Sequence, residues 1–275
     1  MQAGVFAKTF DGDDPDTVMA ASQAAGFAAI QYNMACSGLG SLPLEIPHDT
    51  AVHIHDAAVR SGLQIAAISA TYNMTDPDPD RRARGRAAFH AIAGAAQTMA
   101  SPMLSVCSGS MDPHDKWRRH RDNDLPESWT VMCREFEERC DCAVQHGLLI
   151  GVEPEDANIV SDAEKAARLL AEFPGGPIRI ILDPANILED VPLDHHRDTI
   201  ARALDVLGDH IALAHAKDRY ADGKVAPAGK GIVDWPHFLG GLADAGFDGQ
   251  LIAHGMTADE APAVARFLTQ QIERI

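Results

Sequence analysis

Four short apolar runs in the second half of the sequence each lead to a side chain that can bind a metal ion or carry a proton. Glu153 and Asp183 end two of these runs, and His215 and His254 end the next two. If the runs are neighbouring parallel strands, their carboxyl ends meet at one edge and bring the four side chains together. Two carboxylates and two imidazoles form a mixed oxygen and nitrogen donor set. The set predicts one divalent ion, and Mn, Zn, Co, Fe and Mg are all compatible with it.

The alternation of side chains along a strand supports this convergence. Glu153 and Glu155 fall on one strand face, as do His215 and Lys217, because successive side chains point to opposite sides. Carboxylates on an inward face would be costly to bury without a nearby cation. We therefore expect these side chains, together with His254, to point toward a common site.

Each of these residues also has a purely structural explanation. A carboxylate at a strand end, such as Asp183, often caps the next helix. A single histidine in a strand is often a hydrogen-bonded core residue, and Lys217 could form an ion pair with Asp183 or Asp218. The joint placement of four ligating side chains at successive strand ends favours the metal site over these explanations.

The elements that must position these residues are eight apolar runs, which alternate with eight longer stretches of helical periodicity. The predicted strands are Gly4–Phe10, Ala28–Met34, Gln64–Tyr72, Met103–Gly109, Leu148–Glu155, Ile178–Asp183, His210–Lys217 and Gln250–His254. The predicted helices are Pro15–Ala25, Thr50–Ser61, Arg81–Ala100, Glu127–His146, Ser161–Glu172, His195–Leu207, Trp235–Ala245 and Ala258–Ile275. Asp14 before Pro15, and Ser161 with Glu164 three residues later, are typical helix start signals.

This alternation predicts the fold class. Eight strand–helix units with no Pro/Gly-rich linker indicate a single α/β domain over residues 1–275, a (β/α)8 TIM barrel. An open doubly wound sheet is the alternative. The first strand–helix turn lacks the Gly-rich phosphate-binding sequence of that fold, which favours the barrel.

Composition narrows the class of partner. The chain has 275 residues, and 40 acidic against 23 basic residues give a net charge of −17. Such a charge repels phosphate backbones, so we expect no nucleic-acid partner. We also expect no membrane segment, because no apolar run is long enough, and no signal peptide, because acidic residues come early. Five irregularly spaced cysteines fit a reduced cytoplasm, and the sequence leaves open whether the chain forms a homo-oligomer.

Other polar residues at strand ends are candidates for binding the hydroxyl groups of a small-molecule substrate, because such ligands need many neutral donors and acceptors. These candidates are Lys8, Gln31, Asn33, Asn73 and Asn158. The long polar connection 110–126 holds Trp117 and His120, which we expect to cover the barrel mouth as a lid. Each of these residues is also compatible with a turn, cap or packing role.

The segments GVEPEDANIV, ILDPANIL, HIALAHAKD, GIVDW and GFDGQLIAHG resemble the xylose isomerase-like TIM barrel superfamily, from about Lys8 to the last predicted helix. Its members include sugar and sugar-phosphate isomerases and epimerases, inosose dehydratases and a class of apurinic-site endonucleases. The resemblance implies a divalent-metal site whose family ligands fall on Glu153, Asp183 and His215. The motifs are more specific for the superfamily than for the reaction.

This sequence departs from the family pattern at two positions. The fourth ligand of the family is usually a glutamate at the end of strand eight, where this chain has His254. Asn186 stands where some members have a substrate-binding histidine, and we count it as a candidate substrate contact. In the epimerases, two metal-bound glutamates share the proton transfers. The exchange at His254 therefore puts a two-glutamate mechanism in question.

The resemblance and the donor set together predict an isomerase or epimerase of a sugar or polyol-derived ketone that works through an enediolate. We expect Glu153 or Glu155 to be the base, or His254 if it is not a ligand. Lys217 is placed to polarise an oxygen or bind an acidic group. The alternatives are a lyase or dehydratase that uses the same enediolate, and a non-catalytic sugar-binding barrel. The acidic charge and the single set of ligands disfavour an apurinic-site endonuclease.

Overall fold

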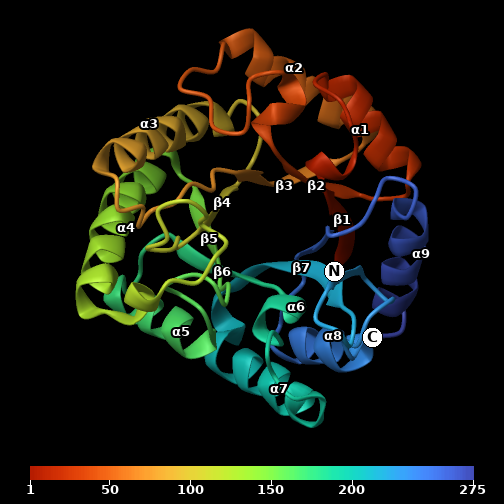
Figure 1. The fold of residues 1–275 in the computed structure, drawn as a ribbon. Coiled ribbons are helices and arrows are strands. Elements are labelled where there is room, and N and C mark those ends of the chain that lie inside the picture. The colour runs from red at the N-terminus through yellow and green to blue at the C-terminus, as the bar shows by residue number, and fades with distance from the viewer.

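The computed structural model describes residues 1–275, and its centre is a closed barrel of parallel strands (Figure 1). Strands β1 to β7 pair in parallel in chain order, and β9 pairs with both β7 and β1, which closes the ring. The barrel strands are β1 (Gln2–Phe6), β2 (Ala29–Tyr32), β3 (Gln64–Ser69), β4 (Met103–Cys107), β5 (Leu149–Glu153), β6 (Ile178–Leu182), β7 (Ile211–Arg219) and β9 (Gln250–Ala253). The ring confirms the predicted (β/α)8 TIM barrel.

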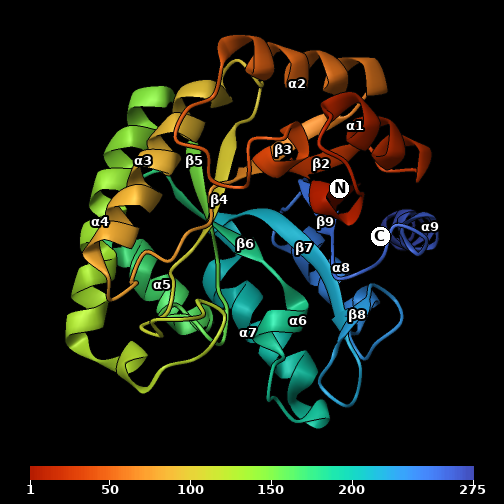
Figure 2. The same cartoon turned by 45° about the horizontal axis from the view of Figure 1, so that its top comes forward.

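At least one α-helix follows each barrel strand, and the helices lie around the outside of the ring (Figures 1 and 2). They are α1 (Pro15–Ala24), α2 (His48–Ser61), α3 (Pro79–Ala96), α4 (Pro126–His146), α5 (Ala163–Glu172), α6 (Pro184–Ile187), α7 (His196–Leu207), α8 (Trp235–Asp244) and α9 (Ala261–Ile272). None of them is long and apolar enough to cross a membrane. The short α6 starts directly after β6, so it presents its N-terminus to the carboxyl-end mouth of the barrel.

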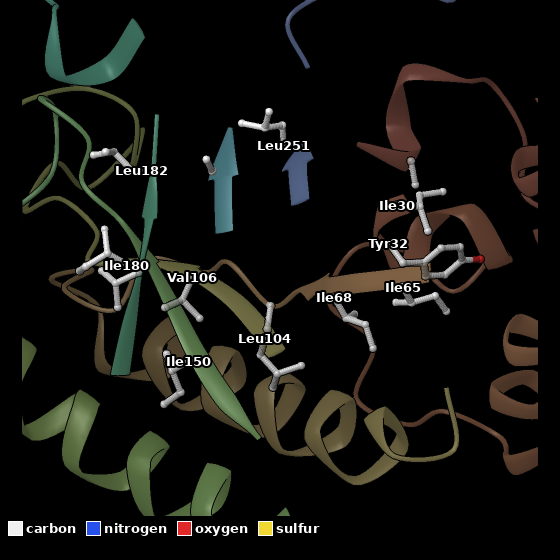
Figure 3. Packing of buried hydrophobic residues seen from close by; sticks show 14 of the residues in the cluster. Ile30, Tyr32, Ile65, Ile68, Leu104, Val106, Ile150, Ile180, Leu182 and Leu251 are labelled. Atoms are coloured by element: carbon white, nitrogen blue, oxygen red, sulfur yellow. The ribbon is translucent and has the colours of Figure 1, made fainter. Parts of the chain in front are cut away.

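Side chains alternate between the two faces of the strands and form two separate apolar layers. The outward-facing ones, among them Ile30, Leu104 and Ile180, are fully buried between the strands and the helices (Figure 3). The second layer lies inside the barrel and consists of Ala29, Ala66, Ala67, Met103, Ile181, Leu213 and Ile252. It fills the barrel below the level at which the strands end.

Gly151 on β5 makes room for this inner layer. A Cβ on Gly151 would lie 2.6 Å from Met103 Sδ and 2.7 Å from Ile181 Cδ1, so a larger residue would displace both side chains. The next inward residue along β5 is Glu153, because inward positions recur every second residue. The inner apolar layer is therefore the floor on which the predicted site residues stand.

Helix starts follow the sequence signals with one shift. Asp14 caps α1 as expected, since its carboxylate accepts a hydrogen bond from Thr17 N at 3.0 Å. The cap of α5 is Asp162 and not Ser161, because the Asp162 carboxylate accepts a bond from Lys165 N at 2.8 Å. The acidic residue is the stronger acceptor next to the positive end of the helix dipole.

Strands β2 to β6 and β9 end one to three residues before the predicted ends, and β1 and β7 differ in ways that change the mouth. β1 ends at Phe6 and not at Phe10, because Ala7–Thr9 turn into the 3-10 helix η1. β7 continues to Arg219 and pairs antiparallel with β8 (Val225–Pro227), a hairpin that the sequence did not predict. Figure 2 shows the end of β7 projecting beyond the ring to meet β8. The extension adds one more inward position beyond Lys217 to the wall of the mouth.

Candidate metal and substrate site

Four side chains from β5, β6, β7 and β9 converge at the carboxyl-end mouth, and their donor atoms all lie within 4.8 Å of one another. His215 Nδ1 is 3.0 Å from a Glu153 oxygen and 3.7 Å from Asp183 Oδ2. His254 Nε2 is 3.1 Å from Asp183 Oδ2. A tetrahedral ion with bonds of ~2.1 Å separates its donors by about 3.4 Å. The four donors therefore fit a single divalent ion with only small side-chain shifts.

Gln31 fixes the orientation of the His215 ring from the far side. Its side-chain oxygen accepts a hydrogen bond of 2.9 Å from His215 Nε2, while its Nε2 group donates to the hydroxyls of Ser69 and Ser105 at 3.3 and 3.1 Å. With the proton on Nε2, the lone pair of a neutral ring is on Nδ1, which faces the carboxylates. That is the tautomer that a metal ligand needs.

Asp183 has two roles. Its Oδ1 accepts a hydrogen bond of 2.8 Å from Ala185 N and so caps α6, as the structural explanation expected. Its Oδ2 faces His254 and, at 3.2 Å, the ammonium group of Lys217. Because the cap uses only one oxygen, the other remains directed into the cluster.

Lys217 and Asn186 complete the polar layer. Lys217 is buried, forms the ion pair with Asp183 and donates a short hydrogen bond to the side-chain oxygen of Asn186. The Asn186 amide nitrogen in turn donates to a Glu153 oxygen at 2.8 Å. Asn186 therefore holds Glu153 and Lys217 at a fixed separation, and Lys217 combines its structural ion pair with a position on the cavity wall.

Opposite charges at short range set the protonation of the metal-free cluster. Burial alone would lower the pKa of His215, but the Glu153 and Asp183 carboxylates outweigh it and raise that pKa to about 9. Burial would raise the pKa of Glu153 and of Asp183, but nearby His215 and Lys217 hold both pKa values below their ordinary range. For His254, burial dominates and lowers the pKa.

Glu155 has a different environment from Glu153. Burial, followed by the neighbouring Glu153 charge, raises the pKa of Glu155 to about 8. Its carboxyl lines the cavity and forms no ion pair. At neutral pH it therefore carries a proton next to an ionised carboxylate, and the two groups together can give up and accept protons.

A cavity of about 600 Å³ opens above the cluster. Glu153, His215, Lys217 and His254 line its inner end. The rest of its wall comes from Phe6, Lys8, Gln31, Asn33, Ser41, Ser69, Thr71, Lys116, Trp117, Glu155, Asn186, Glu189, Arg219 and Val225. Fifteen of the eighteen lining residues are polar or charged, which suits a ligand that is rich in hydroxyl groups.

Most of the predicted substrate contacts lie on this wall. Lys8, Gln31, Trp117, Glu155 and Asn186 all line the cavity. Trp117 is 50% exposed and comes from the long connection between β4 and α4, so the predicted lid residue lies at the mouth and not between helices.

Three of the predicted contacts have side chains that do not line the cavity. Asn73 makes two hydrogen bonds with the backbone of Ser110, at 2.8 and 3.0 Å. Asn158 accepts from Gly109 N at 2.7 Å and donates to the carbonyl of Lys116 at 3.2 Å. His120 caps the 3-10 helix η3 (Arg121–Asp124). All three shape the lid connection and do not face the ligand space.

Sequence reasoning missed several wall residues, of which Lys116, Glu189 and Arg219 carry charge. Arg219 lies two residues beyond Lys217 on the same face of β7, so alternation would have found it had β7 been predicted to its full length. Lys116 precedes Trp117 in the connection already singled out as a lid. Ser69 and Thr71 follow the same alternation at the end of β3.

The closed ring and the carboxylate–imidazole cluster at its mouth define a (β/α)8 barrel with a candidate metal centre. The chain belongs to the xylose isomerase-like TIM barrel family, whose model matches residues 19–271. A search of curated proteins gave no significant match.

Several solved structures share the fold over their whole length. The 3-keto-D-glucoside 4-epimerase from E. coli is 16% identical with a TM-score of 0.79, and 98% of this chain and 99% of that chain are covered. The D-psicose 3-epimerase from Clostridium cellulolyticum H10 is 14% identical with a TM-score of 0.73, covering 99% of each chain. A probable 3-DHS dehydratase from Bacillus anthracis is 14% identical with a TM-score of 0.78, covering 98% of this chain and 99% of that chain. At these identities the likeness shows the fold alone.

Proposed function

We propose that the protein is a divalent-metal-dependent isomerase or epimerase of a sugar or polyol-derived ketone. The observation that carries this proposal is the convergence of four side chains able to bind a metal ion, three of which, Glu153, His215 and His254, also line the cavity. The ion would be held by Glu153, Asp183, His215 and His254. When bound, it would polarise a carbonyl and an adjacent hydroxyl of the substrate and so acidify the neighbouring C–H.

The chain's own residues then move the proton. Glu153 and Glu155 lie two residues apart on one face of β5 and its extension, with Glu155 on the cavity wall. One of these carboxylates takes the proton from carbon, which gives an enediolate. Return of a proton from this carboxylate pair to the neighbouring carbon exchanges ketone and aldehyde. Inversion of the first carbon needs a donor on its opposite face, and His254 would be that donor where it is not bound to the ion. Lys217 lies at the inner end and can donate a hydrogen bond to the developing oxyanion.

Dehydration is a second candidate because His254 replaces the glutamate on which a two-base epimerase relies. A site with one carboxylate pair on β5 can remove a proton and let a β-hydroxyl leave as water, with no second base on the opposite face.

The free cysteines, four of the five buried, support the cytoplasm as the place of action.

Incubation of the Mn²⁺-loaded protein with a panel of ketoses and keto-polyols in D2O tests the proposal by NMR. Isomerisation or epimerisation places deuterium on carbon in a new stereoisomer or aldose, whereas dehydration gives a product lighter by one water. Glu153→Gln is the matched inactive variant, with its fold checked by circular dichroism. Binding without deuterium incorporation or water loss on any compound would favour a non-catalytic sugar-binding barrel.

A further inference from the structure

The two halves of the barrel mouth carry different chemistry. The ligating cluster comes from β5, β6, β7 and β9, which are consecutive around the ring. The other half, formed by the ends of β1 to β4, contributes neutral side chains such as Asn33, Ser69 and Thr71, and two lysines. Lys8 follows β1 and Lys116 follows β4, so both lie on the half of the wall that holds no metal-ligating group.

These two lysines are unusual because they have no carboxylate partner. The chain has six lysines, and Lys165, Lys217 and Lys224 each lie within 4.0 Å of an acidic oxygen. Lys8, Lys116 and Lys230 form no such pair, although acidic residues outnumber basic ones by 40 to 23. Two of the three unpaired lysines therefore line a single cavity in a strongly acidic chain.

The carboxylates of the cavity do not neutralise them. Glu153 pairs with His215, and Asp183 pairs with Lys217. Glu189 pairs with Arg219 at 2.8 Å. Glu155, the remaining carboxyl, follows β5 on the half that carries the cluster.

Lys116 is also held in place by its surroundings. Its backbone carbonyl accepts the bond from Asn158, and its Nζ donates to the carbonyl of Thr71 at 2.8 Å. The ammonium group lies 5.0 Å from the centre of the Trp117 ring. An ammonium group has three N–H donors, so one bond to a carbonyl leaves two for a ligand.

We propose that the substrate is a polyhydroxylated ketone with an anionic group, and that Lys8 and Lys116 bind this group while the carbonyl end lies at the cluster. The anion is a carboxylate or a phosphate ester, since both accept hydrogen bonds from ammonium groups. Neutral side chains between the two ends meet the hydroxyls. This inference rests on the proposed function and narrows its substrate class. It also gives the acidic chain a local positive field that attracts an anion.

Isothermal titration calorimetry of the full Mn²⁺-loaded chain tests the proposed anion site. The three probes are D-fructose, D-fructose 6-phosphate and 5-keto-D-gluconate. At least one anionic probe should bind about tenfold more tightly than D-fructose, as charge-assisted hydrogen bonds allow, and less tightly as salt rises. The two anionic probes distinguish a phosphate from a carboxylate.

Single substitutions of the lysines supply the controls. Lys8→Gln and Lys116→Gln should each weaken binding of the preferred anionic probe about three- to tenfold, and should weaken binding of D-fructose less than that. Lys230→Gln removes the third unpaired lysine, which lies outside this cavity, and should change neither. The inference is overturned if the protein binds D-fructose as tightly as both anions, or binds neither anion saturably. It is also overturned if Lys230→Gln weakens anion binding as much as Lys8→Gln and Lys116→Gln do.

Separate measurements test the proposed function and the proposed anion site. Metal content and deuterium exchange into D-fructose report on the cluster, whereas the preference for an anion over D-fructose reports on the two lysines. Metal binding with exchange into D-fructose but no preference for anions would uphold the function and reject the inference. If the protein binds no metal but still prefers anions, and Lys8→Gln and Lys116→Gln abolish this preference, the proposed function is rejected and the anion site is retained.

Discussion

Gln31 and His215, 184 residues apart in the sequence, are joined by a hydrogen bond of 2.9 Å between Gln31 Oε1 and His215 Nε2. The bond directs His215 Nδ1 toward Glu153 and Asp183 from the opposite side of the barrel. Gln31 itself is held by the hydroxyls of Ser69 and Ser105. Side chains from β2, β3 and β4, which contribute nothing to the cluster, thus orient the candidate ligand His215 on β7.

Gln31→Met should therefore weaken metal binding about 10- to 100-fold, the usual cost of losing a partner behind a ligating imidazole. The measurement is Mn²⁺ or Zn²⁺ affinity by competition with a chelating indicator. Gln64→Met is the control, because Gln64 is exposed at the start of β3 and bonds only to Gln250 on the surface. Equal affinities of the two variants would show that Gln31 does not position the ligand.

The set of four candidate ligands predicts about one bound metal ion per chain. We expect substitution of His254 to remove this ion. His254→Ala should lower the bound metal measured by mass spectrometry after dialysis, and should remove the thermal stabilisation by added metal. An ion present at 100 times its Kd stabilises the folded state by about 2.7 kcal/mol. His53→Ala is the matched control, since His53 belongs to a separate cluster with Asp14 and Asp16 at the surface. Wild-type metal content in His254→Ala would assign His254 another role.

Metal affinity should depend on pH through His215. Because the neighbouring carboxylates raise its pKa to about 9, an ion must displace one proton from it at neutral pH. Affinity should then rise about tenfold per pH unit between roughly pH 6.5 and 9. The pKa of His254 is lowered, so His254→Glu should keep this slope and retain more metal only at lower pH. A flat profile in the wild-type protein would show that His215 binds no ion.

The same proton has an effect of opposite sign on the metal-free protein. A raised pKa means that the protonated ring stabilises the fold fully below the ordinary value of 6.5, and this contribution disappears as the pH rises through about 9. Melting curves in EDTA should show this loss across that interval. Melting curves in saturating Mn²⁺ should stay level there, because His215 carries no proton in either the metal-bound or the unfolded state. Parallel pH profiles with and without metal would contradict the prediction.

Lys217→Met should leave one metal site but lower turnover by at least a factor of ~10, or ~1.4 kcal/mol of transition-state stabilisation. The substitution also leaves buried Asp183 without its cationic partner at 3.2 Å. Removing one partner of a buried pair costs about 3–5 kcal/mol, so the metal-free variant should unfold at lower denaturant concentration. Turnover is therefore compared only on metal-loaded protein with a checked fold. Unchanged kcat would assign Lys217 to the ion pair alone.

Trp117 should report ligand binding by its fluorescence, because it is half-exposed on the cavity wall while Trp129 and Trp235 are buried. Trp117→Phe should remove the ligand-dependent change and leave the signal of the buried indoles. Asn158→Ala should reduce the amplitude, since it frees the carbonyl of Lys116 next to Trp117. A full ligand-dependent change in Trp117→Phe would place the responding indole elsewhere.

The period of two along buried strands was sufficient to predict much of this arrangement from the sequence. Glu153 and His215 project inward because Gly151 and Leu213, two residues earlier, belong to the inner apolar side of the barrel. The closure of the ring follows from eight repeated units, each too apolar to leave a strand face exposed. Such periodic signals survive small errors in strand boundaries.

The loop residues could not be predicted in the same way. Asn73 and Asn158 are as suited to a substrate hydroxyl as to a backbone amide, and only the path of the chain decides which they meet. The hairpin of β7 with β8 is three residues long on one side, which is too short for a periodic signal. Lys116 reaches the cavity because Thr71, 45 residues earlier, offers it a carbonyl.

The apolar floor has a kinetic consequence. The seven side chains that fill the barrel below the cluster, among them Met103, Leu213 and Ile252, close it toward the amino ends of the strands. A molecule at the cluster is therefore shut off from the amino-end side of the barrel, and the cavity lined by Trp117, Lys8 and Lys116 leads from the cluster toward solvent. Substrate and product must use this entrance in turn, so a bound product excludes the next substrate. Product inhibition should accordingly be competitive, and release should slow in step with any change that narrows the entrance.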